Sequence, residues 1–392
     1  MNMVTTRTMN FPNMEDSNLS RGINFEFIRE TFSQKFETPV LYISRGEIAR
    51  NYNALKAALP RTHIHYAVKS NNHQVILDEI YSCGGNFDVC SAGEIDRAVK
   101  AGVKPQELMH SLPVKPVHEF DYAVGQGLDT FVVDNPDEIK KLSRYSDKKL
   151  KIIIRYRINT NTIAVVNLQY KFGCTVDDVL PLAHLIREAG HEFHGLSFHI
   201  GSQCIYPENY VKAITTAGEL IRELDAAGFK TSVLNIGGGF PVEYVEPIPG
   251  IEEFCLPISE ALDDNIRPDI KIICEPGRFI SASPVTLICS IAGKSLRDGK
   301  MWYYLDDGLY STFSGIVFDH CQYPVITNKS GEDKLSVLAG PTCDSFDVMY
   351  DGLMIPEHDI GDMLIFPMTG AYCAVSGSDF NSLRRPEYKI ID

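Results

Sequence analysis

The sequence predicts an α/β protein, in which a (β/α)8 TIM-type barrel is followed by a C-terminal, mostly β domain. Short runs of β-branched and aromatic residues alternate with stretches of helical periodicity between about His63 and Glu275. This alternation is typical of parallel strands joined by crossover helices. An open doubly wound sheet would show the same pattern, but eight strand candidates favour the barrel. After about Ser281 the pattern changes to strand-like segments without long amphipathic helices, which predicts the β domain.

The strand candidates are separated by helix-like segments such as 72–84 and 209–228. Several of these segments end on glycine, as helix C-caps prefer. In chain order, the eight strand candidates are residues 63–68, 86–90, 108–111, 131–134, 151–158, 194–200, 231–236 and 270–275.

Three parts of the chain follow from this pattern. Residues 1–22 are polar, aperiodic and rich in Met and Asn, which predicts a flexible tail. We expect the barrel over residues 23–280 and the β domain over residues 281–392. The segment 38–44 precedes the first barrel strand and is a candidate to pair with the β domain.

Composition excludes several classes of function. The 37 basic and 51 acidic residues give a net charge of −14, which argues against a nucleic-acid binder and is compatible with a cationic small substrate. We find no apolar run long enough for a membrane span and no apolar signal core at the N-terminus. The ten cysteines show neither a CxxC pair nor a zinc-like spacing. They predict no metal site, and they favour reduced thiols in a cytoplasmic protein.

Candidate functional residues are sought where barrel strands end, because barrels carry catalytic groups at the C-terminal ends of strands. Lys69 follows the first strand, in YAVKSN, where partial desolvation would favour a neutral, nucleophilic amine. A surface lysine is the alternative. His199 ends the sixth strand, where its ring could stack on an aromatic cofactor, and Ser202 could contact a phosphate. A histidine with its hydrogen bonds satisfied at the barrel mouth is equally compatible.

The last two strands end in a glycine cluster and in a charged motif. Gly237, Gly238 and Gly239 would allow backbone amides to approach a phosphate, although the pattern is not GxGxxG and a turn needing positive φ is the alternative. In EPGR, Arg278 could bind an anion and Glu275 could face the ring nitrogen of a heterocycle. A Glu–Arg pair that closes the barrel would also explain this motif.

The C-terminal part contributes further polar groups in GPTCDSFD, GAYC and FDH. Cys343 lies beside acidic residues and could donate a proton if its thiol stays protonated, although an isolated cysteine is more often inert. Together with the barrel motifs, these residues supply what pyridoxal phosphate requires. An amine would bond the aldehyde, glycines and an arginine would hold the phosphate, and a carboxylate would face the ring nitrogen.

At this point the chain resembles the fold-type III pyridoxal-phosphate decarboxylases of basic amino acids, and ornithine decarboxylases most. The motifs YAVKSN, FDVCSAGEI, SFHIGSQC, NIGGGFP, EPGR, GPTCDSFD and MTGAYC are spaced as in that family over about residues 38–385. The resemblance implies a Schiff base on Lys69, a ring stacked on His199 and a pyridine nitrogen paired with Glu275. It assigns Cys343 to the protonation of the decarboxylated carbanion.

The resemblance also implies binding roles for other residues. The phosphate would be held by Ser202, Gly238, Gly239, Arg278 and Tyr372. A supporting polar shell would come from Asp88, Glu94 and Arg157. Asp319 and Asp344 would face the distal ammonium of the substrate, where carboxylates suit a diamine by charge pairing. The family forms its active sites between two subunits, so a homodimer is implied.

Three positions depart from the family pattern. Asn235 stands where an aspartate more often precedes the glycine loop, Phe318 stands where tyrosine is common, and Asn159 to Asn161 replace an acidic stretch. We expect decarboxylation of L-ornithine to putrescine and CO2. Lysine or another diamino acid is the alternative substrate. A meso-diaminopimelate decarboxylase, an inactive regulatory homologue and a pyridoxal-phosphate racemase are further alternatives.

Overall fold

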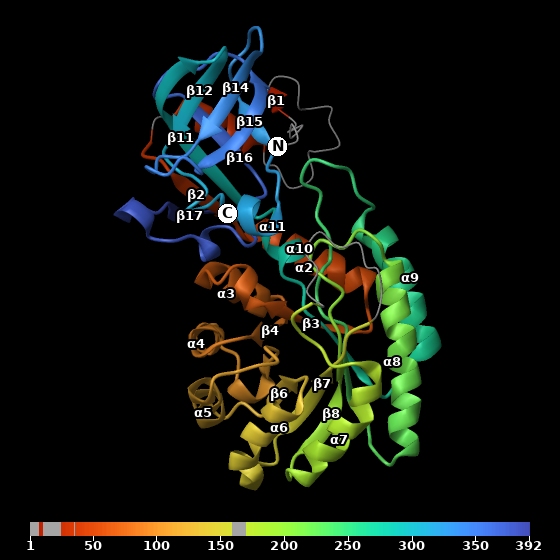
Figure 1. Ribbon diagram of the computed structural model, residues 1–392. Coiled ribbons are helices and arrows are strands. Elements are labelled where there is room, and N and C mark those ends of the chain that lie inside the picture. Colours follow the sequence, from red (N-terminus) through yellow and green to blue (C-terminus); the bar gives the residue numbers. More distant parts are fainter. Residues whose placement is uncertain (1–7, 11–24, 35, 159–169) are drawn as a thin grey trace. The chain divides into compact units, whose positions relative to one another are not determined.

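The computed structural model describes residues 8–10, 25–34, 36–158 and 170–392 of the chain (Figure 1). They form two compact units. The barrel unit comprises Ala49–Pro241 and Ile248–Ile280, and the β unit comprises the chain up to Ile48, Val242–Pro247 and Ser281–Asp392. Most of the expected N-terminal tail and all of Asn159 to Asn161 lie outside the described residues.

The barrel unit contains a closed barrel of parallel strands, which confirms the predicted fold class. The barrel closes because the last strand pairs with the first, for example Ile273 with His63. Buried apolar side chains such as Met109, Ile153 and Val233 form a cluster on its strands. In chain order, the strands are β3 (Thr62–Ala67), β4 (Asn86–Val89), β5 (Met109–His110), β6 (Thr130–Val133), β7 (Lys151–Arg155), β8 (Glu192–Ser197), β9 (Val233–Asn235) and β10 (Lys271–Cys274).

Helices α3 to α9 surround the barrel (Figure 1). They bury one apolar stripe each, as in α4, where Ile95 and Ala98 are buried and Ser91 caps the N-terminus by accepting a hydrogen bond from the Glu94 amide. The helices associated with the barrel are α2 (Arg45–Ala58, which begins in the β unit), α3 (Gln74–Ser82), α4 (Ala92–Lys100), α5 (Val117–Gln126), α6 (Pro136–Leu142), α7 (Val179–Glu188), α8 (Glu208–Ala226), α9 (Ile251–Asn265) and α10 (Arg278–Ser281).

Every barrel strand ends before the last residue of the segment that the sequence predicts for it. The first strand ends at Ala67, whose N–H donates to the carbonyl of Pro276 at 3.1 Å, and the chain then turns into the short helix η3 (Val68–Ser70). Apolar periodicity continues into these turns because their residues are buried as well. The consequence is that the functional candidates lie on strand ends and on the turns that follow.

The β unit is built on a nine-stranded sheet in which β2 pairs with both β11 and β17. This is the pairing considered for segment 38–44, and it places the chain up to Ile48 in the β unit, whereas the expected barrel began at residue 23. The strands are β1 (Thr8–Asn10), β2 (Val40–Ser44), β11 (Val285–Arg297), β12 (Lys300–Leu305), β13 (Val325–Thr327), β14 (Lys334–Ala339), β15 (Val348–Ile355), β16 (Met363–Phe366) and β17 (Glu387–Ile391). Two helices, α1 (Phe25–Ser33) and α11 (Ser314–Asp319), belong to the same unit.

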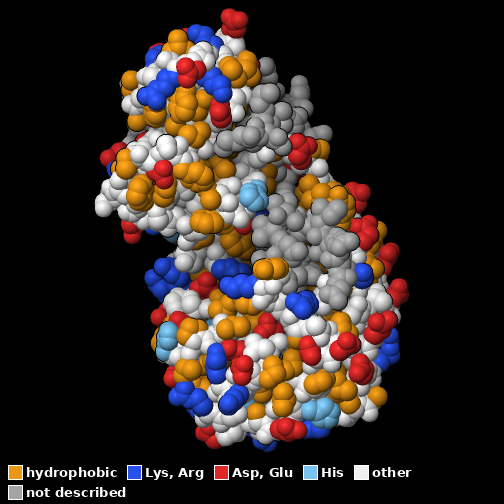
Figure 2. Space-filling model, in the orientation of Figure 1, with side chains coloured by type: hydrophobic (Ala, Val, Ile, Leu, Met, Phe, Trp, Pro, Cys, Tyr) orange, Lys and Arg blue, Asp and Glu red, His pale blue; other side chains and the backbone are white. Residues whose placement is uncertain are grey.

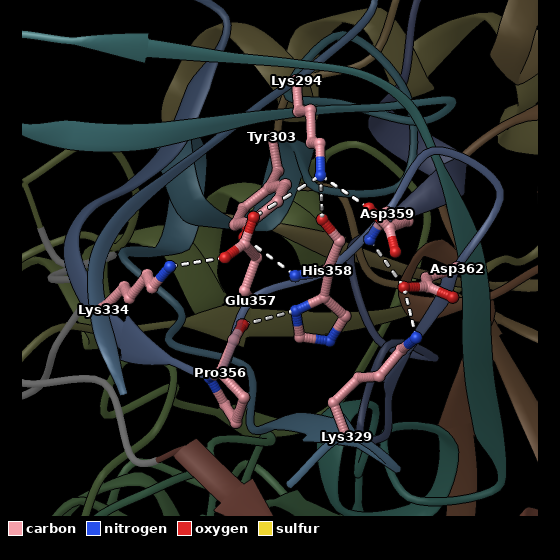
Figure 3. A network of polar contacts seen from close by, with 9 residues as sticks. All are labelled: Lys294, Tyr303, Lys329, Lys334, Pro356, Glu357, His358, Asp359 and Asp362. Atoms are coloured by element: carbon pink, nitrogen blue, oxygen red, sulfur yellow. Dashed lines mark hydrogen bonds and ion pairs between the residues drawn. The ribbon is translucent and has the colours of Figure 1, made fainter. Parts of the chain in front are cut away.

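A charged network fixes the connection between β15 and β16 (Figure 3). Lys294 on β11 lies 2.6 Å from Asp359 and 3.7 Å from Glu357, and Lys329 lies 2.8 Å from Asp362. The partners are at least partly exposed to solvent, so each pair contributes little to the free energy of unfolding. The network therefore defines the course of this connection more than its stability.

Three further observations concern membrane-spanning helices, surface charge and cysteines. Among the described residues, no helix is both long enough and apolar enough to cross a membrane. On the face shown in Figure 2, acidic and basic side chains are interspersed over the barrel unit. Each of the ten cysteines lies in the described part of the chain, and all ten are free thiols.

Candidate active site

Lys69 is positioned by the turn η3 directly after β3, with its ammonium next to a buried carboxylate. Its Nζ lies 3.2 Å from Oδ2 of Asp88, and 40% of the Lys69 side chain remains exposed. Asp88 is fully buried near the end of β4, and its Oδ1 has no hydrogen-bond partner in the described part of the chain. The arrangement therefore holds an accessible amine next to a buried carboxylate, one oxygen of which has no hydrogen-bond partner among the described residues.

Glu275 follows β10 directly and is buried among other ionisable side chains. Its pKa is raised to about 7, mainly by burial and also by Asp88, while Lys69, a hydrogen bond from Asn235, and Arg155 act in the opposite direction. The Asn235 amide donates to Oε1 of Glu275 at 2.5 Å. A buried carboxylate with cations close by can accept a proton or pair with a protonated nitrogen near neutral pH.

The arginine in this cluster is Arg155, and the expectation for Arg157 is not supported by its placement. Arg155 ends β7 and interacts electrostatically with Glu275 and Asp88. The side chain of Arg157, two residues further along the chain, is exposed. The strand β7 ends at Arg155 and not at residue 158. Arg157 therefore lies beyond the strand, and the strand does not direct its side chain toward the acidic residues. The RYR pattern alone does not distinguish the two.

His199 follows β8 and lies beside the glycine loop. A Cβ at Gly238 would lie 3.4 Å from Nε2 of His199 and 2.2 Å from the carbonyl oxygen of Glu275, so this position has no room for a side chain. Burial lowers the pKa of His199 well below its ordinary value, and Arg155 and Lys69 lower it further. The imidazole is therefore neutral at physiological pH, which suits a flat apolar contact.

A potential anion site lies where the loops after β8, β9 and β10 meet. Arg278 is buried at the start of α10 and donates from Nη2 to Oγ of Ser202 at 3.1 Å. Gly239 adopts a positive φ of 112°, and its carbonyl accepts from the Cys204 N–H at 2.9 Å. A Cβ at Gly239 would lie 2.2 Å from the carbonyl oxygen of Gly201, so glycine is required for this approach. An arginine and a hydroxyl beside a glycine loop are donors and a backbone approach that suit a phosphate.

Glu94 belongs to the same electrostatic cluster. Its Oε2 accepts the N–H of Cys90 at 2.7 Å, which fixes the turn between β4 and α4. Burial raises its pKa to about 7, Asp88 raises it further, and the Cys90 amide and Lys69 lower it. Glu94 therefore acts on the charge balance around Lys69 and Asp88 without a direct hydrogen bond to either among those described.

The remaining candidates belong to the β unit. Cys343 is exposed, and its backbone N–H donates to Oδ1 of Asn381 at 3.1 Å. Asp344 accepts the hydroxyl of Tyr310 and, at 3.0 Å, the N–H of Phe346. These two donors hold the pKa of Asp344 below its ordinary value, so its carboxylate is charged at neutral pH. The loop thus presents a thiol and an ionised acid side by side.

Asp347 anchors this loop and was not recognised from sequence. Its side chain is buried and accepts the N–H of Leu309 at 2.8 Å, the N–H of Thr342 at 3.1 Å and the hydroxyl of Thr342 at 2.7 Å. A Cβ at Gly340 would lie 2.3 Å from the same carboxylate. Asp347 is the last residue of the motif GPTCDSFD, and nothing in the motif itself shows that this acid is buried and structural.

Two more candidates lie in the β unit. Asp319 ends α11 and is partly buried, and Tyr372 is partly buried with a positive φ of 55°. The structure therefore brings Lys69, Asp88 and Glu275 together with their neighbours in the barrel unit. It places the predicted thiol, both substrate carboxylates and the tyrosine in the β unit.

The comparison with known proteins identifies the family. Residues 45–282 match the pyridoxal-binding domain of pyridoxal-dependent decarboxylases. The chain is 34% identical to a lysine/ornithine decarboxylase of Selenomonas ruminantium, over 90% of this chain and 89% of that protein. It is 30% identical to the ornithine decarboxylase of Rattus norvegicus, over 95% and 85% of the two chains. A lysine/ornithine decarboxylase from Vibrio vulnificus, solved with putrescine, superimposes with a TM-score of 0.87 and 36% identity, covering 94% of this chain and 98% of that one.

The chain belongs to the pyridoxal-phosphate-dependent amino-acid decarboxylases, the family predicted from its motifs. The site residues fit the cofactor. The buried, unpartnered Asp88 oxygen, the glycine cradle beside His199 and the Arg278–Ser202 pair are accounted for by a charged heterocycle with a phosphate. Lys69 would bond the aldehyde carbon, and Glu275 would face the ring nitrogen.

Proposed function

We propose that this decarboxylase acts on L-ornithine and releases putrescine and CO2, with lysine as the alternative substrate. The ionised carboxylate of Asp344, held by Tyr310 and the Phe346 amide, carries the proposal, because it offers a fixed negative charge for a distal ammonium. Asp319 is the second carboxylate on the same unit. Relatives named for ornithine and for lysine support a basic amino acid as substrate and are compatible with the side-chain length of either one.

The cofactor-binding candidates would contribute separate parts of the reaction. When bound, pyridoxal phosphate supplies the electron-withdrawing ring that stabilises the charge left at Cα after CO2 departs. Glu275 would keep the ring nitrogen protonated, His199 would orient the ring, and Arg278, Ser202, Gly238, Gly239 and Tyr372 would hold the phosphate. Lys69 would hold the cofactor before the substrate amine replaces it.

Cys343 would return a proton to Cα after decarboxylation. Its thiol is exposed on the loop that Asp347 anchors, which supports access to a ligand. We expect Cys343→Ala to slow decarboxylation and to divert part of the substrate to an aldehyde through protonation at the wrong carbon. An unchanged rate and product ratio would remove the role of Cys343.

The proposal extends to a homodimer in which Cys343 and Asp344 serve the Lys69 site of a second copy. A cavity of about 300 Å³ on the β unit is lined by Tyr310, Phe318 and Phe346, and the two phenylalanines are 62% and 58% exposed. Large exposed aromatic side chains around a cavity favour an interface. Mixing inactive Lys69→Ala chains with slowed Cys343→Ala chains should raise the activity to about a quarter of the wild-type value, because half of the dimers then hold one intact site. No recovery on mixing would contradict shared sites.

A cytoplasmic location is proposed from the ten free thiols, which a reducing compartment would preserve. The substrate proposal is tested by CO2 release from a panel of ornithine, lysine and meso-diaminopimelate, with the product mass measured. Asp344→Asn should raise KM for the diamino acid far more than kcat falls, whereas Asp359→Asn, on an exposed turn, should change neither. Preference for meso-diaminopimelate, whose distal end carries a carboxylate, would refute the assignment of Asp344.

The inactive regulatory homologue is the second candidate function. The presence of Lys69, Glu275, Arg278 and Cys343 opposes it. If neither ornithine nor lysine, nor any other basic amino acid in the panel, releases CO2 from the cofactor-loaded protein, that candidate gains support instead.

A further inference from the structure

Asn235, which departs from the family pattern, lies at the centre of the barrel site. It is the last residue of β9, is 1% exposed, and pairs in register with Ile273 on β10 and Ser197 on β8. Its side chain reaches two elements that the cofactor requires. Nδ2 donates to Oε1 of Glu275 at 2.5 Å, and Oδ1 accepts the N–H of Gly237 at 2.9 Å.

The orientation of this amide is determined by chemistry. The partner on one side is the backbone N–H of Gly237, which can only donate, so the oxygen of Asn235 must face it. The nitrogen must then face Glu275, whose carboxylate can only accept while it is ionised. A second N–H of the same group points toward Sδ of Met109 at 3.6 Å. Asn235 is therefore a donor to Glu275 at any pH.

An aspartate at this position would reverse that relation. One of its oxygens would accept from Gly237, and the other would face Oε1 of Glu275 at a hydrogen-bond distance. Two carboxylate oxygens this close require a shared proton. Asparagine forms the same bridge without taking up a proton, so it stabilises an ionised Glu275.

Burial and three charged groups act on the pKa of Glu275 in opposite directions. Asp88 from β4 favours the protonated acid, whereas Lys69 from η3 and Arg155 from β7 favour the carboxylate. Burial also favours the protonated form, and together these effects raise the pKa of Glu275 to about 7. The hydrogen bond from Asn235 acts in the same direction as Lys69 and Arg155 and favours the carboxylate.

We propose that Asn235 is a positioning residue that keeps Glu275 ionised and aimed at the cofactor ring nitrogen, and that it couples this carboxylate to the phosphate-binding glycine loop. This inference rests on the cofactor chemistry of the family and does not depend on which diamino acid is the substrate. Asn235 acts through Glu275 and Gly237 and needs no contact with the substrate.

Three variants test the proposal. Asn235→Leu removes the hydrogen-bond donor to Glu275. Asn235→Asp leaves a side chain that can donate to Glu275 only when it is protonated. Ser197→Ala is the matched control. Ser197 lies at the same level of the barrel, is buried, and its Oγ has no hydrogen-bond partner among the described residues. For each holoenzyme, the visible absorption band of bound pyridoxal phosphate and the cofactor Kd are measured from acid to alkaline pH, beside kcat.

For Asn235→Leu, we expect the acid-side midpoint of the absorption titration to move up by about one to two pH units, because a hydrogen bond to a charged group is lost. The cofactor Kd at neutral pH should rise by about 10-fold or more for the same reason. For Asn235→Asp, we expect near-wild-type behaviour at low pH and an added loss of cofactor on the alkaline side, where the shared proton dissociates. Ser197→Ala should match the wild type.

Two results would overturn the proposal. One is a wild-type titration and cofactor Kd in both Asn235 variants. The other is an equal, pH-independent loss in both, which a purely structural role would produce. Failure of the substrate assignment is distinguishable, because it would appear as a lack of turnover in the wild type while these spectroscopic shifts persisted.

Discussion

Asp347→Ala tests whether a buried acid in the β unit sets the position of Cys343 and Asp344. The substitution removes three hydrogen bonds to a carboxylate, from the Leu309 amide and from the amide and hydroxyl of Thr342. Hydrogen bonds to charged groups contribute about 1.5–3 kcal/mol each. Part of the loss is recovered because Thr342 is only partly buried and its donors can reach water. We therefore expect the free energy of unfolding of the β unit to fall by about 3–4 kcal/mol.

The chain offers a specific probe for this measurement. Its single tryptophan, Trp302, lies on β12, so tryptophan fluorescence during urea denaturation reports on the β unit. In the folded variant, kcat should fall by about 10- to 100-fold, because small displacements of reacting groups are costly. The absorbance of bound cofactor should remain, because the barrel residues are unchanged.

Asp351→Ala is the matched control for this change. Asp351 pairs with Lys300 at 2.5 Å, but its side chain is 51% exposed, so its loss should cost no more than about 1 kcal/mol. If Asp347→Ala and Asp351→Ala had the same midpoint and the same kcat, the anchoring role of Asp347 would be refuted.

Further predictions concern the barrel unit. In the apoenzyme, Glu275→Gln should gain about 3 kcal/mol of stability relative to the wild type as pH rises from about 4.5 to about 7, because the buried acid binds a proton in the folded state that the unfolded chain has released. Urea denaturation at several pH values, followed by circular dichroism, measures this difference. A difference that stays constant with pH would contradict the prediction. Arg155→Met should weaken cofactor binding by raising the pKa of Glu275 further, whereas Arg157→Met should leave the cofactor Kd unchanged; equal effects would restore the sequence-based assignment. Lys115→Met should lower the free energy of unfolding by about 3 kcal/mol, because this buried lysine donates to three carbonyls, including that of Val132 at 2.7 Å. A loss below about 1 kcal/mol in the same denaturation assay would show that water replaces those hydrogen bonds.

Most of the fold was predictable from the sequence because its periodicity is strong. All eight barrel strands fall within or beside the segments predicted for them, and the change of pattern at Ser281 coincides with the return of the chain to the β unit. Strand ends were less predictable. The turns after β3 and β7 bury apolar residues too, so hydrophobicity continues past the last ladder hydrogen bond. The domain boundary at Ile48 depends on long-range pairing of β2, for which the sequence offered segment 38–44 as a candidate without fixing the boundary.

The candidate site was predictable where a motif names a chemical group and less so where geometry selects among similar residues. Lys69 lies in the turn after β3, and Glu275 and Arg278 follow β10, which is where the barrel rule looks for functional groups. The selection of Arg155 over Arg157 depends on where β7 stops. Asn235 looked like a departure from the family, and only its contacts with Glu275 and Gly237 show a function for the amide.

We propose that the amine of Lys69 makes this barrel a decarboxylase. The most direct measurement is the release of labelled CO2 from carboxyl-labelled ornithine by the wild type and by Lys69→Ala, with pyridoxal phosphate in excess and the absorbance of bound cofactor recorded in the same samples. We predict CO2 release and a protein-bound cofactor band in the wild type, and loss of both in Lys69→Ala. Retention of the band and of turnover in Lys69→Ala would contradict the claim.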